Sequence, residues 1–123
     1  MIRSDSNTTS PFGQYDQPAD SYEVITPEQA KQIMDTEEGY LILDVRNKGE
    51  YESCHIEGAA CLPLRSILDG SREGLEDKNQ RILVYCEHGN RSRQAGAELA
   101  ADGYTNVMVF GGIVDWPYET IKS

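Results

Sequence analysis

Apolar residues gather in three short, uninterrupted runs: YLILDV at 40–45, RILVYC at 81–86 and NVMVF at 106–110. Because apolar and polar positions do not alternate within them, these runs are typical of strands buried on both faces of a parallel sheet. Two weaker runs, YEVI at 22–25 and AACLPL at 59–64, predict shorter strands. The chain therefore supplies candidate strands for one buried sheet.

Helical patterns fill the segments between these strands. The stretch TPEQAKQIMDTEEG is read as a helix that Thr26 caps, that has Pro27 at its first position and that ends at Gly39. Gly103 stands at the usual C-cap position of a later helix. Helices are also predicted at 48–53, 64–68 and 92–102. Strands that alternate with helices predict an α/β sandwich.

Length and charge narrow the class of protein. A chain of 123 residues fits a single domain. Its formal net charge of −10 argues against a nucleic acid or an anionic membrane as partner, because both are bound by surplus Lys and Arg. No apolar run approaches the ~20 residues that a membrane span needs. An anionic substrate must therefore be captured by local groups, against the overall charge.

The beginning of the chain differs in composition from the rest. Residues 1–20 are rich in Ser, Asn, Thr, Asp, Gln, Gly and Pro, so we predict a disordered extension before a domain at 21–123. The segment has no apolar stretch and does not read as a secretory signal. The three cysteines, Cys54, Cys61 and Cys86, lack the spacing of a disulfide framework. Reduced thiols and a cytoplasmic location are expected.

The stretch VYCEHGNRSRQAG predicts an active site. Cys86 ends a predicted central strand, and ligands of open parallel sheets sit beyond the carboxyl ends of the strands. The following turn leads to a helix start near Ser92, where free N–H groups and the helix dipole attract anions. Gly89 permits a tight curl, and Arg91 adds a planar fork suited to an oxyanion. Such surroundings favour the thiolate, which is the nucleophilic form of cysteine.

Three motifs carry a resemblance to a known family. CEHGNRS resembles the active-site loop of the rhodanese (thiosulfate sulfurtransferase) family, commonly Cys-x-x-Gly-x-Arg-Ser. LDVRNKGEYESCHIEGAACLPL is similar to that family's Asp-x-Arg, Glu-Tyr and Gly-His-Ile-x-Gly-Ala signature, and VFGGIVDW to its closing Gly-Gly-Ile-x-x-Trp. The opening ITPEQA also matches, so the likeness covers 22–118. It implies a three-layer sandwich with a central, mostly parallel, five-stranded sheet between helices.

The same resemblance implies a sulfurtransferase without a cofactor. Cys86 would take the outer sulfur of a thiosulfate-like donor as a persulfide and pass it to cyanide, a cellular thiol or thioredoxin. The backbone donors of residues 87–91 would hold the persulfide, and Arg91 would fix the loop and attract the anion. The implied anion-binding loop consists of Glu87, His88, Gly89, Asn90, Arg91 and Ser92.

Other functions remain open. The same fold could serve as a sulfur carrier or a docking module without turnover of its own. Arsenate reductase or phosphatase chemistry is disfavoured because Arg91 lies five positions after Cys86, and phosphatase-type loops insert one more residue. Glu87 would also repel a dianion unless it faces solvent. His88 could contact substrate or could be an exposed loop residue.

No metal site is expected, although Cys54, His55, Cys86 and His88 are all possible ligands. Cys54 precedes the strand at 59–62, so we expect it at the amino end of that strand. Cys86 ends a parallel strand, so the two cysteines should lie a sheet's width apart. That separation is too large for two ligands of one zinc ion or for a disulfide. Cys54 also stands where the family has glycine, which would be strained if that position needs a positive φ.

The remaining candidates have structural interpretations. Asp44 and Arg46 follow a strand on the same side as Cys86, and together with Glu50 they could form a charge-paired corner that holds the second helix. A functional alternative places Arg46 at the pocket mouth. His55 is read as a buried imidazole that hydrogen-bonds backbone, and Cys61 as a core residue.

Overall fold

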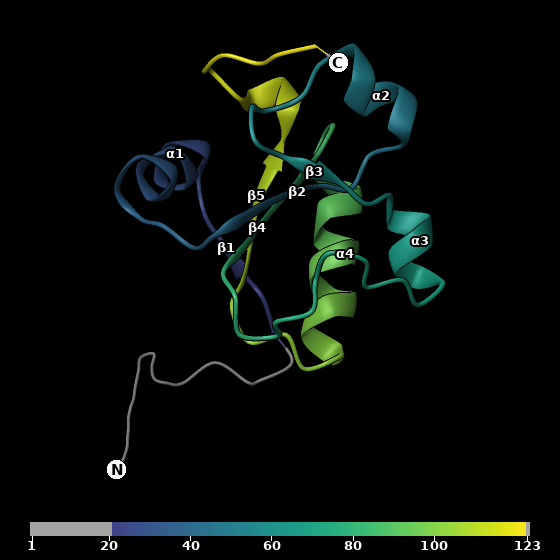
Figure 1. The fold of residues 1–123 in the computed structure, drawn as a ribbon. Coiled ribbons are helices and arrows are strands. Elements are labelled where there is room, and N and C mark those ends of the chain that lie inside the picture. The colour runs from purple at the N-terminus through teal and green to yellow at the C-terminus, as the bar shows by residue number, and fades with distance from the viewer. Residues whose placement is uncertain (1–20, 123) are drawn as a thin grey trace.

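The computed structural model describes residues 21–122, so the predicted extension at 1–20 lies outside the described residues. Five parallel strands form one sheet in the order β1-β5-β4-β2-β3 (Figure 1). The strands are β1 (Glu23–Val24), β2 (Leu41–Asp44), β3 (Ala60–Cys61), β4 (Ile82–Cys86) and β5 (Val107–Gly112). Each of the five predicted strands is present, and β4 lies at the centre of the sheet.

Helices cover both faces of this sheet. They are α1 (Pro27–Thr36), α2 (Lys48–Ser53), α3 (Leu64–Leu68) and α4 (Asn90–Ala101), followed by a short 3₁₀ turn, η1 (Ile113–Asp115). In Figure 1, α1 lies on one side of the strands, α3 and α4 lie on the other, and α2 stands at the end where α4 begins. This arrangement confirms the predicted three-layer α/β sandwich, with a sheet that is parallel throughout.

The alternation of side chains along β4 divides the core into two clusters. Ile82, Val84 and Cys86 belong to the cluster that includes residues of α3 and α4, while Leu83 and Tyr85 belong to the cluster beneath α1. Successive side chains of a strand point to opposite faces, so a strand covered on both faces is apolar along its whole length. Cys86 thus projects toward the side of α4.

Two of the differences from the predicted element boundaries lie beside Cys86. Helix α4 begins at Asn90 rather than Ser92, because Gly89, at φ +110°, ends the loop as the N-cap residue. Strand β5 continues through Gly111 and Gly112, past the end of the apolar run at 106–110, and Gly112 pairs with Cys86 across an irregularity in the ladder. The loop after Cys86 is therefore shorter, and better supported, than the sequence suggested.

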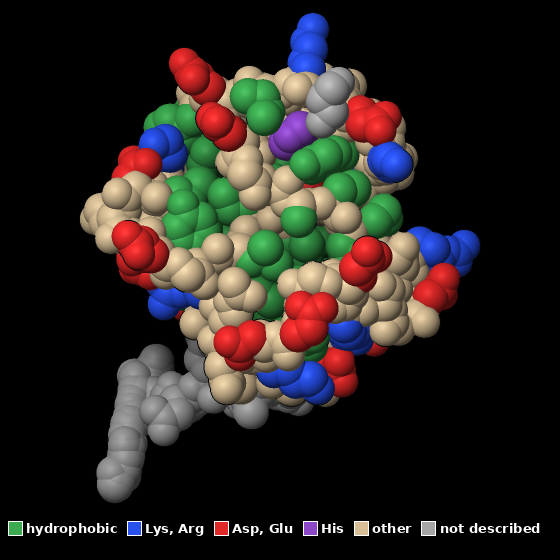
Figure 2. Space-filling view, viewed as in Figure 1, with side chains coloured by type: hydrophobic (Ala, Val, Ile, Leu, Met, Phe, Trp, Pro, Cys, Tyr) green, Lys and Arg blue, Asp and Glu red, His purple; other side chains and the backbone are tan. Residues whose placement is uncertain are grey.

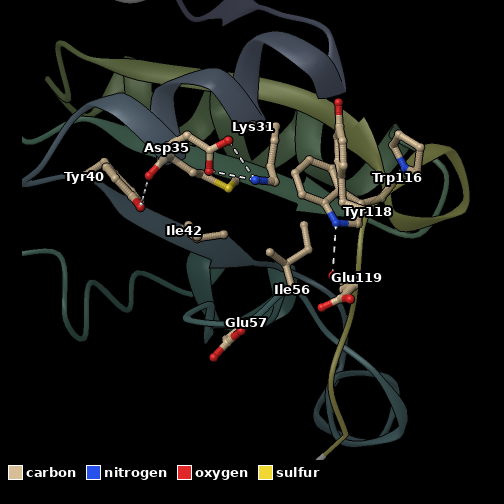
Figure 3. Close-up of a pocket in the computed structure, with 11 residues that line it drawn as sticks. Lys31, Asp35, Tyr40, Ile42, Ile56, Glu57, Trp116, Tyr118 and Glu119 are labelled. Atoms are coloured by element: carbon tan, nitrogen blue, oxygen red, sulfur yellow. Dashed lines mark hydrogen bonds and ion pairs between the residues drawn. The ribbon is translucent and has the colours of Figure 1, made fainter.

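A hollow of about 780 Å³ lies between α1, β2 and the C-terminal segment, away from Cys86. Figure 2 shows apolar side chains gathered in this region with acidic ones around them. In Figure 3, Ile42 and Ile56 face the hollow, while Lys31 is paired with Asp35 at 2.7 Å on its wall. The hollow has no cysteine or histidine in its lining. Between residues 21 and 122, no helix has the length and apolar character to span a bilayer.

Candidate active site

Cys86 stands at the carboxyl end of the central strand, as predicted. The residue is 1% exposed, and its Sγ accepts a hydrogen bond from the backbone N–H of Gly89 at 3.0 Å. The positive φ of Gly89 turns the chain back over the sulfur, which is a conformation that favours glycine. The thiol therefore faces a peptide N–H at the start of α4, where the helix dipole favours negative charge.

The loop offers further donors around the sulfur. Within the described chain, the N–H groups of His88, Asn90 and Arg91 have no protein acceptor. The N–H groups of the first helical turn lack intrahelical partners by geometry. Unpaired donors at a helix N-terminus form a ready site for an anion. The arrangement can stabilise a thiolate, a persulfide or an oxyanion above Cys86.

The end of β5 supports this loop from beneath. A Cβ built on Gly112 would lie 2.0 Å from the carbonyl oxygen of Glu87, so only glycine fits there. The same carbonyl accepts a hydrogen bond from Val114 N–H at 3.2 Å. Ser92 is fully buried, and its Oγ lies 3.0 Å from the carbonyl oxygens of both Gly89 and Gly111. Ser92, predicted as a loop residue, therefore ties α4 to β5 and does not line the opening.

A buried arginine joins three segments next to the loop. Arg46 is 2% exposed, and its Nη2 lies 2.8 Å from the Asp44 carboxylate. Its Nη1 contacts Glu87 at 3.2 Å, and Nη2 also donates to the carbonyl of Cys54. Burial opposes the charged guanidinium, but the hydrogen bonds and charge of Asp44 outweigh it and raise the pKa of Arg46. Glu87 is thus paired with Arg46, which it shares with Asp44, and this contact weakens the repulsion between Glu87 and an approaching anion.

A second ion pair joins α2 to the loop. The two guanidinium nitrogens of Arg91 contact the two carboxylate oxygens of Glu50 at 2.8 and 3.0 Å, and both side chains are about one-third exposed. Hydrogen bonding to Arg91, opposed by some burial, lowers the pKa of Glu50 to about 2. The predicted corner of Asp44, Arg46 and Glu50 is therefore corrected: Asp44 and Arg46 form a pair, but Glu50 is bonded to Arg91.

The other predicted residues divide between the surface and the core. His88 and Asn90 are exposed in the loop. His55 is buried, its Nδ1 lies 2.8 Å from the Tyr51 carbonyl, and its ring stacks on that of Tyr51, in agreement with the structural interpretation. Cys61 is only partly buried, with Sγ 3.6 Å from the Arg46 carbonyl, so it is not a full core residue.

The position expected for Cys54 is wrong. Strand β3 pairs with the last residues of β2, Ala60 with Leu43, so the segment before β3 lies near the carboxyl end of the sheet. The carbonyl of Cys54 is bonded to Arg46, which also contacts Glu87. The separation argument against a metal site therefore fails, although no group of three or more potential ligands is assembled within residues 21–122. Cys54 has φ −167°, an extended conformation, so replacing glycine here causes no backbone strain.

Sequence reasoning missed two supports of the loop, Gly112 and Val114. Gly112 lies beyond the apolar run at 106–110, and a contact between Glu87 and Gly112, 25 positions apart, leaves no local pattern. Two ion pairs, Arg46 with Glu87 and Arg91 with Glu50, each join residues 41 positions apart, so no local sequence pattern predicts them.

A buried thiol at the end of a central parallel strand, beneath the amides of a glycine turn, defines a cysteine-loop α/β protein. The sequence model of the rhodanese-like domain family matches residues 26–118. The chain is 38% identical over 103 residues to thiosulfate sulfurtransferase GlpE of Pseudomonas syringae, covering 80% of this chain and 93% of that protein. It is 35% identical over 80 residues to thiosulfate sulfurtransferase PspE of Escherichia coli, covering 65% and 77%.

Solved structures agree with the sequence relatives. An E. coli rhodanese with anions superposes with a TM-score of 0.62 at 33% identity, covering 68% of this chain and 99% of that one. The chain belongs to the rhodanese-like domain family. It is a sulfurtransferase of the rhodanese type, and the predicted fold and family are confirmed.

Proposed function

We propose that the protein transfers a sulfane sulfur through a persulfide on Cys86. The observation that carries this proposal is the hydrogen bond of 3.0 Å from Gly89 N–H to Cys86 Sγ. It directs a partial positive charge at the sulfur where a thiolate must form. A thiosulfate-like donor is favoured because relatives of this length are named thiosulfate sulfurtransferases.

The reaction consists of two displacements at sulfur. The Cys86 thiolate attacks the outer sulfur of thiosulfate, a new S–S bond forms, and the old S–S bond breaks with release of sulfite. A nucleophilic acceptor, which we take to be a thiol, thioredoxin or cyanide, then attacks the outer sulfur of the persulfide. The S–S bond of the persulfide breaks, and its electron pair returns to Cys86. No outside oxidant or reductant is consumed.

The residues of the loop have separate roles in this scheme. The free N–H groups of His88, Asn90 and Arg91 are the donors for the persulfide and for the leaving sulfite. The Arg91 side chain stays bonded to Glu50, so we assign it to positioning the loop as well as to attracting the anion. Asp44 and Arg46 hold the wall of the site without touching substrate.

Two further expectations belong with this proposal. We place the protein in the cytoplasm, which is consistent with three free thiols. We take residues 21–123 as the catalytic domain and 1–20 as an extension without chemistry of its own. Neither nucleic acid nor membrane is proposed as a partner, given the net charge of −10.

The test is persulfide formation on purified protein, followed by intact mass spectrometry. With thiosulfate, the wild type should gain the mass of one sulfur atom, and reduction should remove it. Cys86→Ser should gain nothing and should lose thiosulfate-to-cyanide transfer, whereas Cys54→Ser should keep both. A sulfur adduct that forms only from a protein donor would instead indicate a carrier. Persulfide formation in Cys86→Ser would contradict the assignment.

A further inference from the structure

A groove beside the loop plays no part in the reaction described so far. It has a volume of about 340 Å³ and is lined by Val45, Pro63, Leu64, Arg65, Leu68 and Arg91, among others. The space lies at the lower end of the range for small-molecule sites, ~300–1,000 Å³. It is formed by the segment after β2, by α3 and by the active-site loop, which are three separate parts of the chain.

The groove borders the cradle of Cys86. Val45 N–H donates to the carbonyl of Tyr85, the residue before Cys86, at 3.1 Å, and Leu64 N–H donates to the Val45 carbonyl at 3.0 Å. Leu64 also packs against the core cluster that contains Cys86. Arg91 belongs to the loop and lines the groove at once. The groove therefore lies beside the active-site loop, with which it shares Arg91.

The lining combines an apolar wall with two guanidinium groups. Pro63, Leu64 and Leu68 form the wall, and Leu68 is 48% exposed. Arg65 is exposed and has no acidic partner anywhere in residues 21–122, unlike most arginines of this acidic protein. A cation without an acidic partner in the described chain, next to an exposed leucine and a partly exposed one, is complementary to an organic anion.

Neighbouring carboxylates do not cancel this charge. Asp44 and Glu87, which contact the loop or its supports, share Arg46, and Glu50 is paired with Arg91, so none of these three carboxylates is paired with Arg65. The guanidinium of Arg65 is therefore available to bind a ligand. The apolar wall offers nothing to a compact, hydrated donor such as thiosulfate. An organic thiol with a carboxylate uses both parts of the groove.

We propose that this groove binds the sulfur acceptor, a small thiol that carries a carboxylate on a short apolar spacer, with Arg65 as the carboxylate partner. The proposal rests on the proposed persulfide reaction. The acceptor thiolate attacks the outer sulfur of the Cys86 persulfide, the S–S bond breaks, and Cys86 leaves as thiolate. The acceptor departs as its own persulfide, and its thiol proton has gone to solvent.

The experiment starts from protein already loaded with persulfide and follows the loss of the sulfur adduct. The two acceptors are 3-mercaptopropionate and its neutral amide, which differ only in the charged group. Wild type should react faster with the carboxylate, relative to the reaction of each thiolate with free cysteine persulfide. Arg65→Gln should reduce that preference about fivefold to tenfold, the size expected for losing one charge-assisted contact. Arg65→Lys should retain part of it.

Two further variants separate local contact from general charge. Lys48→Gln removes one positive charge at the start of α2, outside the lining of the groove, so the preference of this variant should match that of the wild type. Leu68→Glu, at an exposed position, puts a carboxylate into the groove and should lower the preference below that of Arg65→Gln.

The possible failures are distinguishable. If the wild type shows no preference for the carboxylate, the groove is not the binding site of the acceptor, and the persulfide mechanism is unaffected. The same holds if Lys48→Gln loses as much preference as Arg65→Gln. If no persulfide can be loaded on Cys86, both proposals fall.

Discussion

The active site has a floor and a rim, and the two are built differently. The floor consists of Asp44, Arg46, Ser92 and Gly112, all buried and all in contact with other parts of the chain. The rim includes Arg65, which is exposed and lacks an acidic partner in the described chain, and Arg91, which is one-third exposed. Buried polar groups must be paired, whereas exposed ones gain little from pairing.

This difference assigns separate tasks to the two regions. The floor fixes where the sulfur and the loop amides lie, because each floor residue joins segments that are far apart in sequence. The rim leaves Arg65 without an acidic partner in the described chain and Arg91 partly exposed, so the rim can discriminate among substrates while contributing little to the stability of the fold. A floor variant should therefore change the free energy of unfolding and the rate with every substrate. A rim variant should change the free energy of unfolding by about 1 kcal/mol at most and should change selected rates.

The largest effect is expected for Arg46→Met. The substitution leaves Asp44 as a buried carboxylate without its cation, since Asp44 is fully buried. Loss of one partner of a buried ion pair costs about 3–5 kcal/mol. Urea unfolding should show this decrease. Arg81→Met is the matched control, because Arg81 is paired with Glu37 at the surface and should cost about 0–1 kcal/mol. Equal losses of stability would mean that burial of the ion pair between Arg46 and Asp44 does not set its contribution to the fold.

A smaller loss of stability, together with a large loss of rate, is expected for Gly112→Ala. The added Cβ would lie 2.0 Å from the Glu87 carbonyl oxygen, so the loop must move. Overpacking of this kind costs about 1–3 kcal/mol. A displacement of about 1 Å at a reacting group lowers rates about 100-fold. Persulfide formation, followed by mass spectrometry, measures the rate.

Gly49→Ala provides the comparison for this variant. Its Cβ would meet nothing closer than Asn47 Oδ1 at 3.7 Å, an ordinary contact in helix α2. It should form the persulfide at the wild-type rate. If Gly112→Ala forms it equally fast, the loop does not depend on β5 for its position.

Features that a few neighbouring residues determine could be predicted from the sequence, whereas features that depend on distant pairing could not. The bounds of α2 and α3 match because caps and a proline mark them within a few residues. Cys86 was placed correctly because a continuous apolar run can only lie inside the sheet. Cys54 was misplaced because the pairing of β3 with the end of β2 depends on register, which no short pattern encodes. The partners of Arg46 and Arg91 lie 41 positions away and follow from the fold alone.

The smallest effect concerns the rim and depends on pH. The Arg91 contact lowers the pKa of Glu50 from its ordinary 4.5 to about 2. The folded state binds this proton less readily than the unfolded state, so the ion pair stabilises fully above pH 4.5 and is lost as the pH falls toward 2. Glu50→Gln lacks this contribution, yet glutamine can still close the capping box with Asn47.

Unfolding of the two proteins should therefore be compared across this range of pH. The difference in free energy should be below about 1 kcal/mol at neutral pH, because the pair is partly exposed and screened. It should shrink steadily from pH 4.5 to 2, since protonated Glu50 resembles glutamine. A difference that stays constant with pH would mean that Glu50 stabilises the protein through packing and not through charge. In that case the ion pair between Arg91 and Glu50 would contribute nothing to the free energy of unfolding.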